Sequence, residues 1–365
     1  MPGIRAAVMA TPHAPIEMRE VPLPVLGDGE AMLRTLYSEV CGTDVHLHEG
    51  RLSGVPYPII PGHVSIGHIE SLRGTITDID GVPFREGDLV TFLDVHETCG
   101  HCYECLVTKQ TTRCTHRKVY GITYGLNDGP LGGWAEQIWM KRGVNMLRIP
   151  AGVDPITFMA GGCGLVTALH AVERAGVKLG NSVAILGVGP VGQAALALAR
   201  LSGAHPVIAI GDPQSRREFA SSMGATDTIG LDLPAAERAA RVHELTGGHG
   251  VDIVIEAAGV PDAVTQALDL VRDGGRVVVV GQYTDAGTTT LNPHRQINRK
   301  HAEIFGCWGC DYSHFHRALQ VLAHQGSALP WAAGITSRFP LSRANEALAA
   351  VASRAVVKAI ITPNS

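Results

Sequence analysis

The segment Gly187-Val188-Gly189-Pro190-Val191-Gly192 constrains this chain most, because it stands between an apolar run, Val183–Leu186, and a helical pattern, Gln193–Leu201. In such a strand–turn–helix unit the first glycine permits a tight turn and the second lets the backbone approach a pyrophosphate. The third lets the helix pack on the strand. The start of the following helix would then point its amide donors at the phosphates of a dinucleotide, with Pro190 and Val191 in the turn before it. We therefore expect a dinucleotide-binding parallel sheet in this region.

An acidic residue stands where such a unit needs one. Asp212 lies 20 residues after Gly192 and closely follows the predicted strand Val207–Ile210. A carboxylate at this place accepts hydrogen bonds from ribose hydroxyls and repels a 2′-phosphate, which favours NAD over NADP. Arg216 and Arg217 follow closely and could reach a phosphate, so NADP stays open as the less favoured alternative.

Apolar strands and helices alternate through the middle of the chain, and the strands there are continuously apolar. Such strands are typical of a parallel sheet covered on both faces. Residues 1–155 instead hold short strand-like runs rich in Gly, Pro and His, and residues 301–365 hold two helices and a last strand. We expect an α/β protein in which a doubly wound parallel-sheet domain, residues 156–300, is inserted between the two parts of a β-rich domain. Edge strands near Arg276–Gln282 are expected to pair two copies across a two-fold axis.

Composition excludes several classes of protein. A chain of 365 residues exceeds the size at which a single core usually divides into domains, and 45% hydrophobic with 18% charged residues excludes a disordered chain. The formal net charge of −4 without a Lys/Arg block argues against a nucleic-acid partner. The longest apolar stretch, Ser182–Leu201, is interrupted by Gly and Pro and makes a poor membrane span. The absence of a recognisable targeting segment favours a cytoplasmic protein.

Four of the eight cysteines crowd into sixteen residues, in the pattern Cys99-x2-Cys102-x2-Cys105-x8-Cys114. In a chain of this size and expected compartment, such crowding indicates a metal rather than disulfides. Four thiolates close a tetrahedral zinc site that has no open position. We therefore expect a structural zinc in a lobe at about residues 95–118.

A second metal site needs three protein ligands and one open position, and three residues are candidates for it: Cys41, His63 and Cys163. Cys41 lies in the run Cys41-Gly42-Thr43-Asp44, which places a thiol beside a hydroxyl and a carboxylate. Pro61-Gly62-His63 reads as a sharp turn that presents an imidazole. Gly162-Cys163-Gly164 precedes a predicted helix.

Taken together and in this order, these motifs resemble the zinc-dependent medium-chain alcohol dehydrogenases, and the resemblance covers essentially the whole chain. The residues that carry it are Cys41–Asp44, Gly62-His63, the four-cysteine lobe, Gly162–Thr167 and Gly187–Gly192. The resemblance implies a β-rich catalytic domain related to a small chaperonin-like barrel, and an inserted Rossmann domain. It also implies an NAD-dependent enzyme with one catalytic and one structural zinc, assembled as a homodimer or homotetramer.

The resemblance also implies roles for single residues. Cys41, His63 and Cys163 would bind the catalytic zinc. Asp44 would orient the imidazole of His63, and Thr43 would accept the proton of the substrate hydroxyl and pass it toward His46, the outer base of a relay. A partly exposed surface histidine remains the alternative for His46.

Toward the cofactor, the resemblance implies that Thr167 and Val191 pack against the nicotinamide. Lys358 would face the pyrophosphate, and an exposed lysine at the end of a strand remains the alternative for it.

The chain departs from the family pattern in three places. Val64 follows His63 where most members carry Glu, which predicts a less negative surrounding for the zinc and no ligand exchange through that residue. The interval from Cys105 to Cys114 is one residue longer than usual, which leaves the zinc interpretation intact. Cys307-x2-Cys310 lacks a partner pair and is interpreted as packed thiols.

Five apolar residues are candidates for the wall of a substrate pocket: Leu52, Tyr57, Val95, Trp134 and Trp308. Packing in the hydrophobic core is the alternative for each of them. We therefore predict that the substrate is an apolar secondary or cyclic alcohol, such as a terpenoid alcohol, and in reverse its ketone. A polyol dehydrogenase is the nearest rival, although such members usually bring Glu as third ligand where this chain has Cys163. A non-catalytic, zinc-stabilised dinucleotide-binding protein is the rival from another class.

Overall fold

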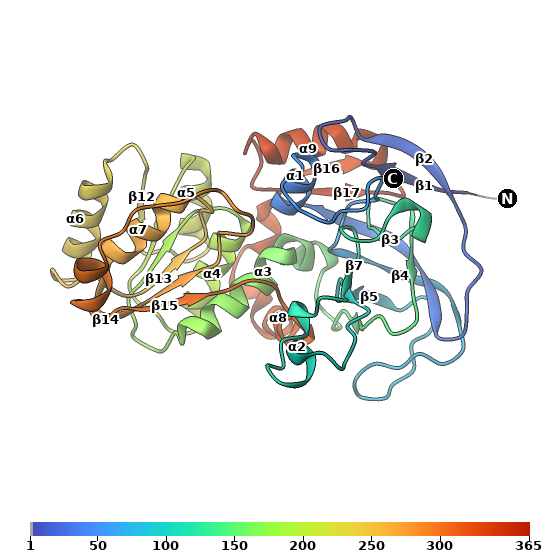
Figure 1. Cartoon of the computed structure of the whole chain (residues 1–365), viewed down its shortest axis with the longest axis horizontal. Coiled ribbons are helices and arrows are strands. Elements are labelled where there is room, and N and C mark those ends of the chain that lie inside the picture. Colours follow the sequence, from blue (N-terminus) through green and yellow to red (C-terminus); the bar gives the residue numbers. More distant parts are fainter. Residues whose placement is uncertain (1–2) are drawn as a thin grey trace. The chain divides into compact units, whose positions relative to one another are not determined.

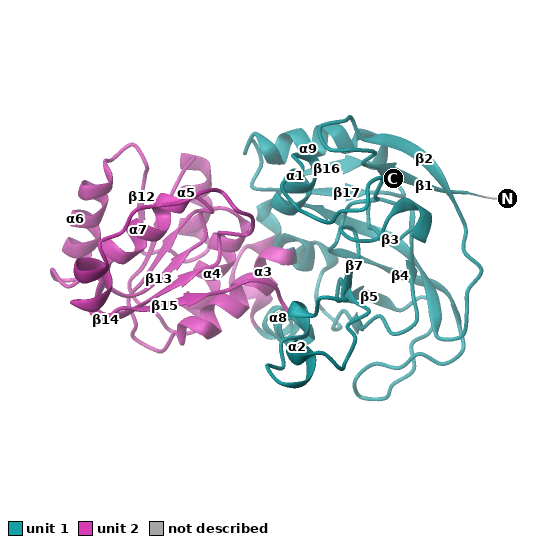
Figure 2. Ribbon diagram, in the orientation of Figure 1, with its two compact units in different colours: residues 1–162, 311–324, 332–365 teal, residues 163–310, 325–331 magenta. Residues whose placement is uncertain are grey.

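The computed structural model describes residues 3–365, which divide into two compact units (Figure 2). The first unit runs to Gly162 and also contains Asp311–His324 and Ala332–Ser365. The second contains Cys163–Cys310 and Gln325–Trp331. The main segment of the second unit thus runs to Cys310, beyond the predicted boundary at 300, and Glu303–Gly306 joins its sheet as a sixth strand.

The second unit is built on a six-stranded sheet in the order β12-β11-β10-β13-β14-β15, and every pairing in it is parallel (Figure 1). Its strands are β10 (Val183–Leu186), β11 (Val207–Ile210), β12 (Asp227–Ile229), β13 (Val251–Glu256), β14 (Val271–Val279) and β15 (Glu303–Gly306). Its helices are α4 (Pro190–Leu201), α5 (Gln214–Ser222), α6 (Ala235–Leu245) and α7 (Pro261–Leu270). A π-helical turn, η3, spans His294–Asn298.

Every residue of β10 and β11 is buried, in agreement with their continuously apolar sequences. The prediction that the strand near Arg276–Gln282 forms an edge is wrong, because β14 lies between β13 and β15. The edge on that side is β15, which is mostly exposed. From the sequence alone, β15 was hidden by its mixed polar and apolar residues, which give no continuous apolar run.

The strand order reverses between β10 and β13, and this is the place where a parallel sheet of this type binds ligands. Gly187 follows β10 and Ala257 follows β13, and the N–H of Ala257 donates to the carbonyl of Leu186. The glycine segment predicted to bind a dinucleotide is therefore at the carboxyl edge of the central strands.

The first unit contains a seven-stranded, largely antiparallel sheet in the order β16-β17-β3-β4-β5-β9, with β8 paired to β3. Its strands are β3 (Glu30–Val40), β4 (Ser65–Arg73), β5 (Leu89–Phe92), β8 (Gln137–Met140), β9 (Met146–Arg148), β16 (Ile335–Pro340) and β17 (Lys358–Thr362). Two small sheets pair β1 (Gly3–Val8) with β2 (Glu17–Pro22), and β6 (Val95–His96) with β7 (Lys118–Val119). Its helices are α1 (Gly42–His48), α2 (Tyr103–Leu106), α8 (Tyr312–Gln325) and α9 (Ala344–Ala352).

Short 3-10 turns complete the chain: η1 (Thr111–Arg113), η2 (Leu126–Asp128), η4 (Gly326–Ala328), η5 (Trp331–Gly334) and η6 (Leu341–Arg343). Each unit has hydrophobic clusters of its own. In the first unit one cluster surrounds Trp134 and another surrounds Phe92, while in the second unit a cluster lies along Ile208 and Val254.

Helix α3 (Pro155–Ala175) is the one helix of residues 3–365 that is long and apolar enough to cross a membrane by length and composition. It is broken at Gly162 (φ 48°, ψ −142°), and 67% of its most apolar window is buried inside the molecule. Burial against protein accounts for its apolar character, as for the core helix of a globular domain.

Candidate functional site

Cys41, Thr43 and Asp44 are held on one turn of backbone. Strand β3 ends at Val40, and Cys41 is the N-cap of α1. The Asp44 carboxylate accepts the N–H of Cys41 at 2.8 Å, and the Cys41 sulfur accepts the N–H of Thr43 at 3.3 Å. These reciprocal bonds satisfy amide groups that the start of a helix leaves without partners. The thiol, the hydroxyl and the fully buried carboxylate are thus fixed relative to one another.

Gly62 presents the imidazole of His63. Its φ of 90° favours glycine, and a Cβ there would come within 2.5 Å of both the Ser38 hydroxyl and the Trp134 ring. Burial alone would lower the pKa of His63, but negative groups nearby raise that pKa to about 9. These groups are Cys41, Asp94, Asp44 and Glu39. A surrounding that favours a protonated imidazole equally favours a bound cation.

The third candidate ligand follows the break in α3, since Cys163 is the residue after Gly162. The sulfurs of Cys41 and Cys163 and a ring nitrogen of His63 all lie within 4.8 Å of one another. Two thiolates and an imidazole are donors that zinc prefers, and three protein ligands leave the fourth position of a tetrahedron open. The donor set therefore fits a catalytic zinc.

Burial raises the pKa of the Asp44 carboxyl to about 6, against the opposing effect of His63. Val64, where a Glu was expected by resemblance, is buried and apolar. Glu39 of strand β3 donates its N–H to the Val64 carbonyl at 3.0 Å and contributes to the raised pKa of His63. Its carboxylate is paired with the Lys358 ammonium, so it does not replace the missing charge in full.

The four cysteines of the lobe also converge, with all four sulfurs within 4.8 Å of one another and none in a disulfide. The N–H of Cys99 donates to the Cys114 sulfur, and the N–H of Cys102 donates to the Cys99 sulfur, both at 3.3 Å. Hydrogen bonds from backbone N–H groups to sulfur stabilise the thiolate form of cysteine. The longer interval before Cys114 is taken up by the 3-10 turn Thr111–Arg113. This donor set fits a closed structural zinc.

The three glycines of the dinucleotide segment each meet a different need. Gly187 has a φ of 104°, and a Cβ there would meet the Ala257 carbonyl at 2.7 Å. A Cβ on Gly192 would lie 1.8 Å from the Gly187 carbonyl oxygen, so the close packing of α4 on β10 requires glycine. A Cβ on Gly189 would meet nothing within 4 Å, which leaves the space that a pyrophosphate needs. The residues present therefore fit a dinucleotide.

Asp212 and Arg217 form an ion pair instead of standing free. Arg217 Nη1 contacts one carboxylate oxygen of Asp212 and donates to the Gly211 carbonyl at 3.1 Å. The other carboxylate oxygen accepts the N–H of Leu231 at 2.9 Å. Arg217 thus compensates part of the charge that was expected to repel a 2′-phosphate.

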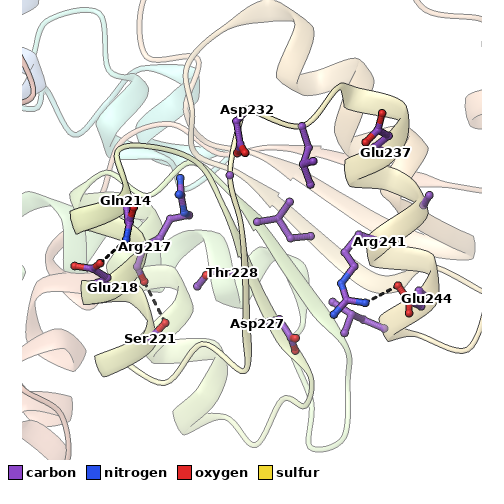
Figure 3. A pocket seen from close by; sticks show the side chains of 15 residues that line it. Gln214, Arg217, Glu218, Ser221, Asp227, Thr228, Asp232, Glu237, Arg241 and Glu244 are labelled. Carbon is purple, nitrogen blue, oxygen red and sulfur yellow. Dashed lines mark hydrogen bonds and ion pairs between the residues drawn. The ribbon is translucent and has the colours of Figure 1, made fainter.

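A cavity of about 830 Å³ lies beside this pair, between α5 and α6 at the edge strand β12 (Figure 3). Acidic and basic side chains mix in its lining, and several pair with one another, as Arg241 does with Glu244. Of the predicted site residues only Arg217 lines it. Its mixed charge gives no single class of ligand a reason to bind.

Lys358 has a different surrounding from the predicted one. Its side chain is only 2% exposed, its ammonium lies 2.7 Å from Glu39 Oε1, and it donates to the carbonyls of Ala160 and Gly161. An ammonium with these three acceptors is neither an exposed lysine nor directed at a pyrophosphate. The strand pairing of β17 with β3 places it there, which the end-of-strand position in the sequence could not show.

Four of the residues predicted to line an apolar pocket belong to one hydrophobic cluster of the first unit or pack on it. Trp134 is fully buried and its ring N–H donates to the Glu39 carbonyl, so it belongs to the core and not to a pocket wall. Leu52, Tyr57 and Val95 are partly buried and pack on the same cluster.

In the second unit, Trp308 stacks on Tyr283 and Thr167 Oγ1 lies 3.6 Å from the Cys310 sulfur. Val191 lies in the first turn of α4 and is partly buried. Cys307 is buried, in keeping with the interpretation as packed thiols.

Two carboxylates near His63 were missed by the sequence analysis, Glu39 and Asp94. Both raise the pKa of His63, and the pKa of Asp94 is itself raised by burial. The available signal was an acidic residue within or directly behind an apolar strand, since such residues are rarely buried without a partner.

Comparison with known proteins agrees with this arrangement. The chain matches the model of the alcohol dehydrogenase GroES-like domain over residues 27–151 and that of the zinc-binding dehydrogenases over residues 190–324. It is 35% identical over 360 residues to 5-exo-hydroxycamphor dehydrogenase of Pseudomonas putida, with 98% of each chain covered.

Two solved structures superpose on the whole chain. The crystal structure of an alcohol dehydrogenase from Thermotoga maritima matches with a TM-score of 0.94 and 30% identity, and both chains are fully covered. A zinc-binding dehydrogenase from Sinorhizobium meliloti, bound to NADP, matches with a TM-score of 0.87 and 27% identity, again over both full chains.

The chain therefore belongs to the zinc-dependent medium-chain alcohol dehydrogenase family, with the α/β fold that the sequence predicted. It is an oxidoreductase that acts on the CH–OH group of a small molecule, with zinc and a nicotinamide dinucleotide, NAD(P)(H), as cofactors.

Proposed function

We propose that this chain oxidises an apolar secondary or cyclic alcohol to its ketone with NAD, and catalyses the reverse reduction. The observation that carries the proposal is the convergence of Cys41, His63 and Cys163 within 4.8 Å, beside a turn that holds Thr43 and Asp44. A closed structural site would not need an open fourth position or a hydroxyl next to it.

In this proposal Cys41, His63 and Cys163 hold the catalytic zinc, and the four lobe cysteines hold the structural zinc. When bound, zinc supplies a Lewis acid toward the substrate oxygen, and NAD supplies the hydride acceptor. The buried Asp44 carboxylate fixes the turn that carries Cys41 and increases the basicity of the His63 ligand.

The proton of the substrate hydroxyl leaves through α1. The Thr43 hydroxyl accepts it first, and His46 lies three residues further along the same helix and therefore on the same face. Burial and the nearby Arg51 lower the pKa of His46, so its imidazole is neutral at pH 7. A neutral imidazole can take up the proton and release it to solvent.

The substrate class rests on three partly buried apolar side chains of the first unit and on one relative. Leu52, Tyr57 and Val95 are partly buried and carry no charge. The relative that shares 35% identity over nearly the whole chain is named for a hydroxylated camphor, an apolar cyclic compound. Both favour an apolar alcohol over a polyol, whose hydroxyls would require polar partners.

We further propose that the chain assembles as a homodimer or homotetramer and works in the cytoplasm. The exposed edge strand β15 offers unpaired backbone groups to a second copy. None of the eight cysteines, all within the described residues, forms a disulfide, which fits a reducing compartment.

The test follows NADH formation by absorbance with a panel of cyclic secondary alcohols, linear alcohols and polyols, with NAD or NADP. The same assay is repeated after chelation and after zinc is restored. We expect chelator-sensitive activity that is highest with the cyclic alcohols. Cys163→Ala should lose activity and one of the two zinc ions. Cys307→Ala removes a thiol outside both ligand sets, and it should keep its activity and both zinc ions.

Activity confined to polyols would overturn the proposed substrate class, while zinc-dependent alcohol oxidation would still hold as the reaction. Full activity after loss of the zinc ion assigned to Cys41, His63 and Cys163 would overturn the catalytic role of that zinc. Silence with every alcohol and either cofactor, with two zinc ions bound, would favour a non-catalytic dinucleotide-binding protein.

A further inference from the structure

A buried ion pair joins Glu39 to Lys358 behind the three candidate zinc ligands. Glu39 Oε1 lies 2.7 Å from Lys358 Nζ, and the two side chains are 1% and 2% exposed. Removing two such charges from water is costly, and a buried pair of this kind seldom stabilises a fold more than apolar residues of similar size. A stability role alone is therefore a weak reason for its presence.

The backbone of Glu39 connects it to two of the ligand-bearing segments. Glu39 precedes Cys41 by two residues on β3, and its N–H donates to the carbonyl of Val64, the residue after His63, at 3.0 Å. Its own carbonyl accepts the ring N–H of Trp134 at 3.0 Å. The position of Glu39 is thus linked to the positions of the two segments that carry Cys41 and His63.

The side chain of Lys358 connects the pair to the third segment. Strand β17 runs antiparallel to β3, with Ala359 opposite Val40. From there Nζ donates to the carbonyls of Ala160 and Gly161 at 3.2 and 3.0 Å, just before the break in α3. Carbonyls at the end of a helical segment commonly lack intrahelical donors, and the Lys358 ammonium supplies a donor to these two.

The backbone of the break leaves no free space around the pair. A Cβ on Gly162 would lie 2.2 Å from Glu39 Oε2 and 2.4 Å from Lys358 Nζ. Gly162 has a φ of 48° and is followed directly by Cys163. A shift of either charged group would therefore move the residue next to the third ligand.

We propose that Glu39 and Lys358 are a positioning pair for the catalytic zinc, which sets where Cys163 stands relative to Cys41 and His63. The inference rests on the proposed function, because it takes these three residues as the zinc ligands. The pair touches neither substrate nor cofactor in this account and acts through the ligands. A positioning pair should matter for zinc retention and geometry more than for fold stability.

The test compares Glu39→Gln, Lys358→Met and the double variant Glu39→Gln/Lys358→Met with the unmodified chain. Three quantities are measured: zinc ions per chain, the rate at which a chelator extracts each zinc, and the visible absorption spectrum after cobalt replaces the catalytic zinc. The structural zinc of the four-cysteine lobe serves as an internal standard in every sample. Thermal unfolding is followed in parallel.

The single variants leave one buried charge without a partner, so we expect both to unfold at lower temperature. The double variant should regain most of that loss, because neither charge remains. Its catalytic zinc should nevertheless be extracted about 10- to 100-fold faster than in the unmodified chain, the usual effect of losing a group that orients metal ligands. Its cobalt spectrum should shift, and extraction of the structural zinc should not change.

Arg148→Met is the matched control, because Arg148 is a partly buried cation of the same unit whose partners are Asp78, Asp88 and Pro83. It should lower the unfolding temperature without changing extraction of either zinc. Glu39→Asp keeps the negative charge on a side chain that is one methylene shorter. If the double variant does not fold, the same zinc and cobalt measurements are made on Glu39→Asp.

A double variant with the unmodified extraction rate and cobalt spectrum would overturn the positioning role and leave the proposed function standing. An unmodified chain that binds only the lobe zinc would overturn the proposed function, and the positioning role with it. The zinc content of the unmodified chain thus separates the two failures.

Discussion

At the scale of single residues, the electrostatics of helix α1 decide which groups can carry a proton. Asp44 is fully buried and its carboxylate accepts the Cys41 N–H at the start of the helix, so we expect it to serve as an orienting group and not as a base. His46 is half-buried, and burial and Arg51 lower its pKa. An imidazole that stays neutral through the physiological range can accept a proton from Thr43 at pH 7.

The first prediction concerns the pH dependence of alcohol oxidation. The protonated form of His46 cannot accept a proton, so kcat/KM should be highest above the lowered pKa of His46 and should fall as the pH falls through it. His46→Gln should remove this limb of the profile and lower kcat/KM by up to about 100-fold, the lower end of general acid–base contributions. The measurement is kcat/KM for a cyclic alcohol between mildly acidic and neutral pH.

His48→Gln provides the control on the same helix, since His48 Nε2 bonds the Ala14 carbonyl and has no place in the relay. It should keep the pH profile of the unmodified chain. An unchanged profile in His46→Gln would remove His46 from the relay.

At the scale of elements, the turn between β10 and α4 shows one motif with two kinds of glycine. Gly192 is required by packing within the fold, because a Cβ there collides with the Gly187 carbonyl. Gly189 has an extended backbone (φ −76°, ψ 179°) and open space around it, so nothing in the fold itself requires glycine there. The need for Gly189 comes from the ligand.

The second prediction separates these needs. Gly192→Ala should lower the free energy of unfolding by roughly 1–3 kcal/mol, the usual cost of overpacking. Gly189→Ala should change it by less than about 0.5 kcal/mol. It should nevertheless weaken NADH binding by about tenfold or more, some 1.4 kcal/mol, because the methyl group fills the approach of the pyrophosphate.

Denaturant unfolding and titration of NADH fluorescence check both variants. A Gly189→Ala protein that binds NADH as well as the unmodified chain would show that the pyrophosphate does not approach this turn.

At the scale of the whole molecule, the two units have separate hydrophobic clusters, and the glycine segment and the four-cysteine lobe lie in different units. The parallel sheet of the second unit holds the glycine segment, and the first unit holds the four-cysteine lobe. The lobe consists of a four-residue helix, a 3-10 turn and a two-stranded sheet, which are too short to be stable without a metal.

The third prediction is that the two units respond to different ligands during thermal unfolding. NADH at about 100 times its Kd should stabilise the unit that binds it by about 2.7 kcal/mol, since it binds only the folded state. Removal of zinc should destabilise the first unit instead. Calorimetry should therefore show one transition that shifts up with NADH and one that shifts down with chelation.

Gly189→Ala is the control for the calorimetry, because tenfold weaker binding should reduce the stabilisation at the same NADH concentration to about 1.4 kcal/mol and leave the effect of chelation unchanged. A single transition that moves with both ligands would mean that the two units unfold as one.

Much of the molecule was readable from sequence because its signals are local. The run Cys41–Asp44, the turn at Gly62 and the spacing of the four cysteines involve residues within a few positions of one another. The strands β10 and β11 were found at their observed bounds because each is a continuous apolar run next to a glycine turn.

What only the tertiary structure decided are pairings between segments far apart in the chain. β15 joins its sheet although its own sequence gives little sign of it, and Lys358 meets Glu39 because β17 pairs with β3. Asp212 is likewise held by Leu231 from a different loop. A buried charge is placed by the partner that the folded sheet brings to it, and a sequence names the charge without naming that partner.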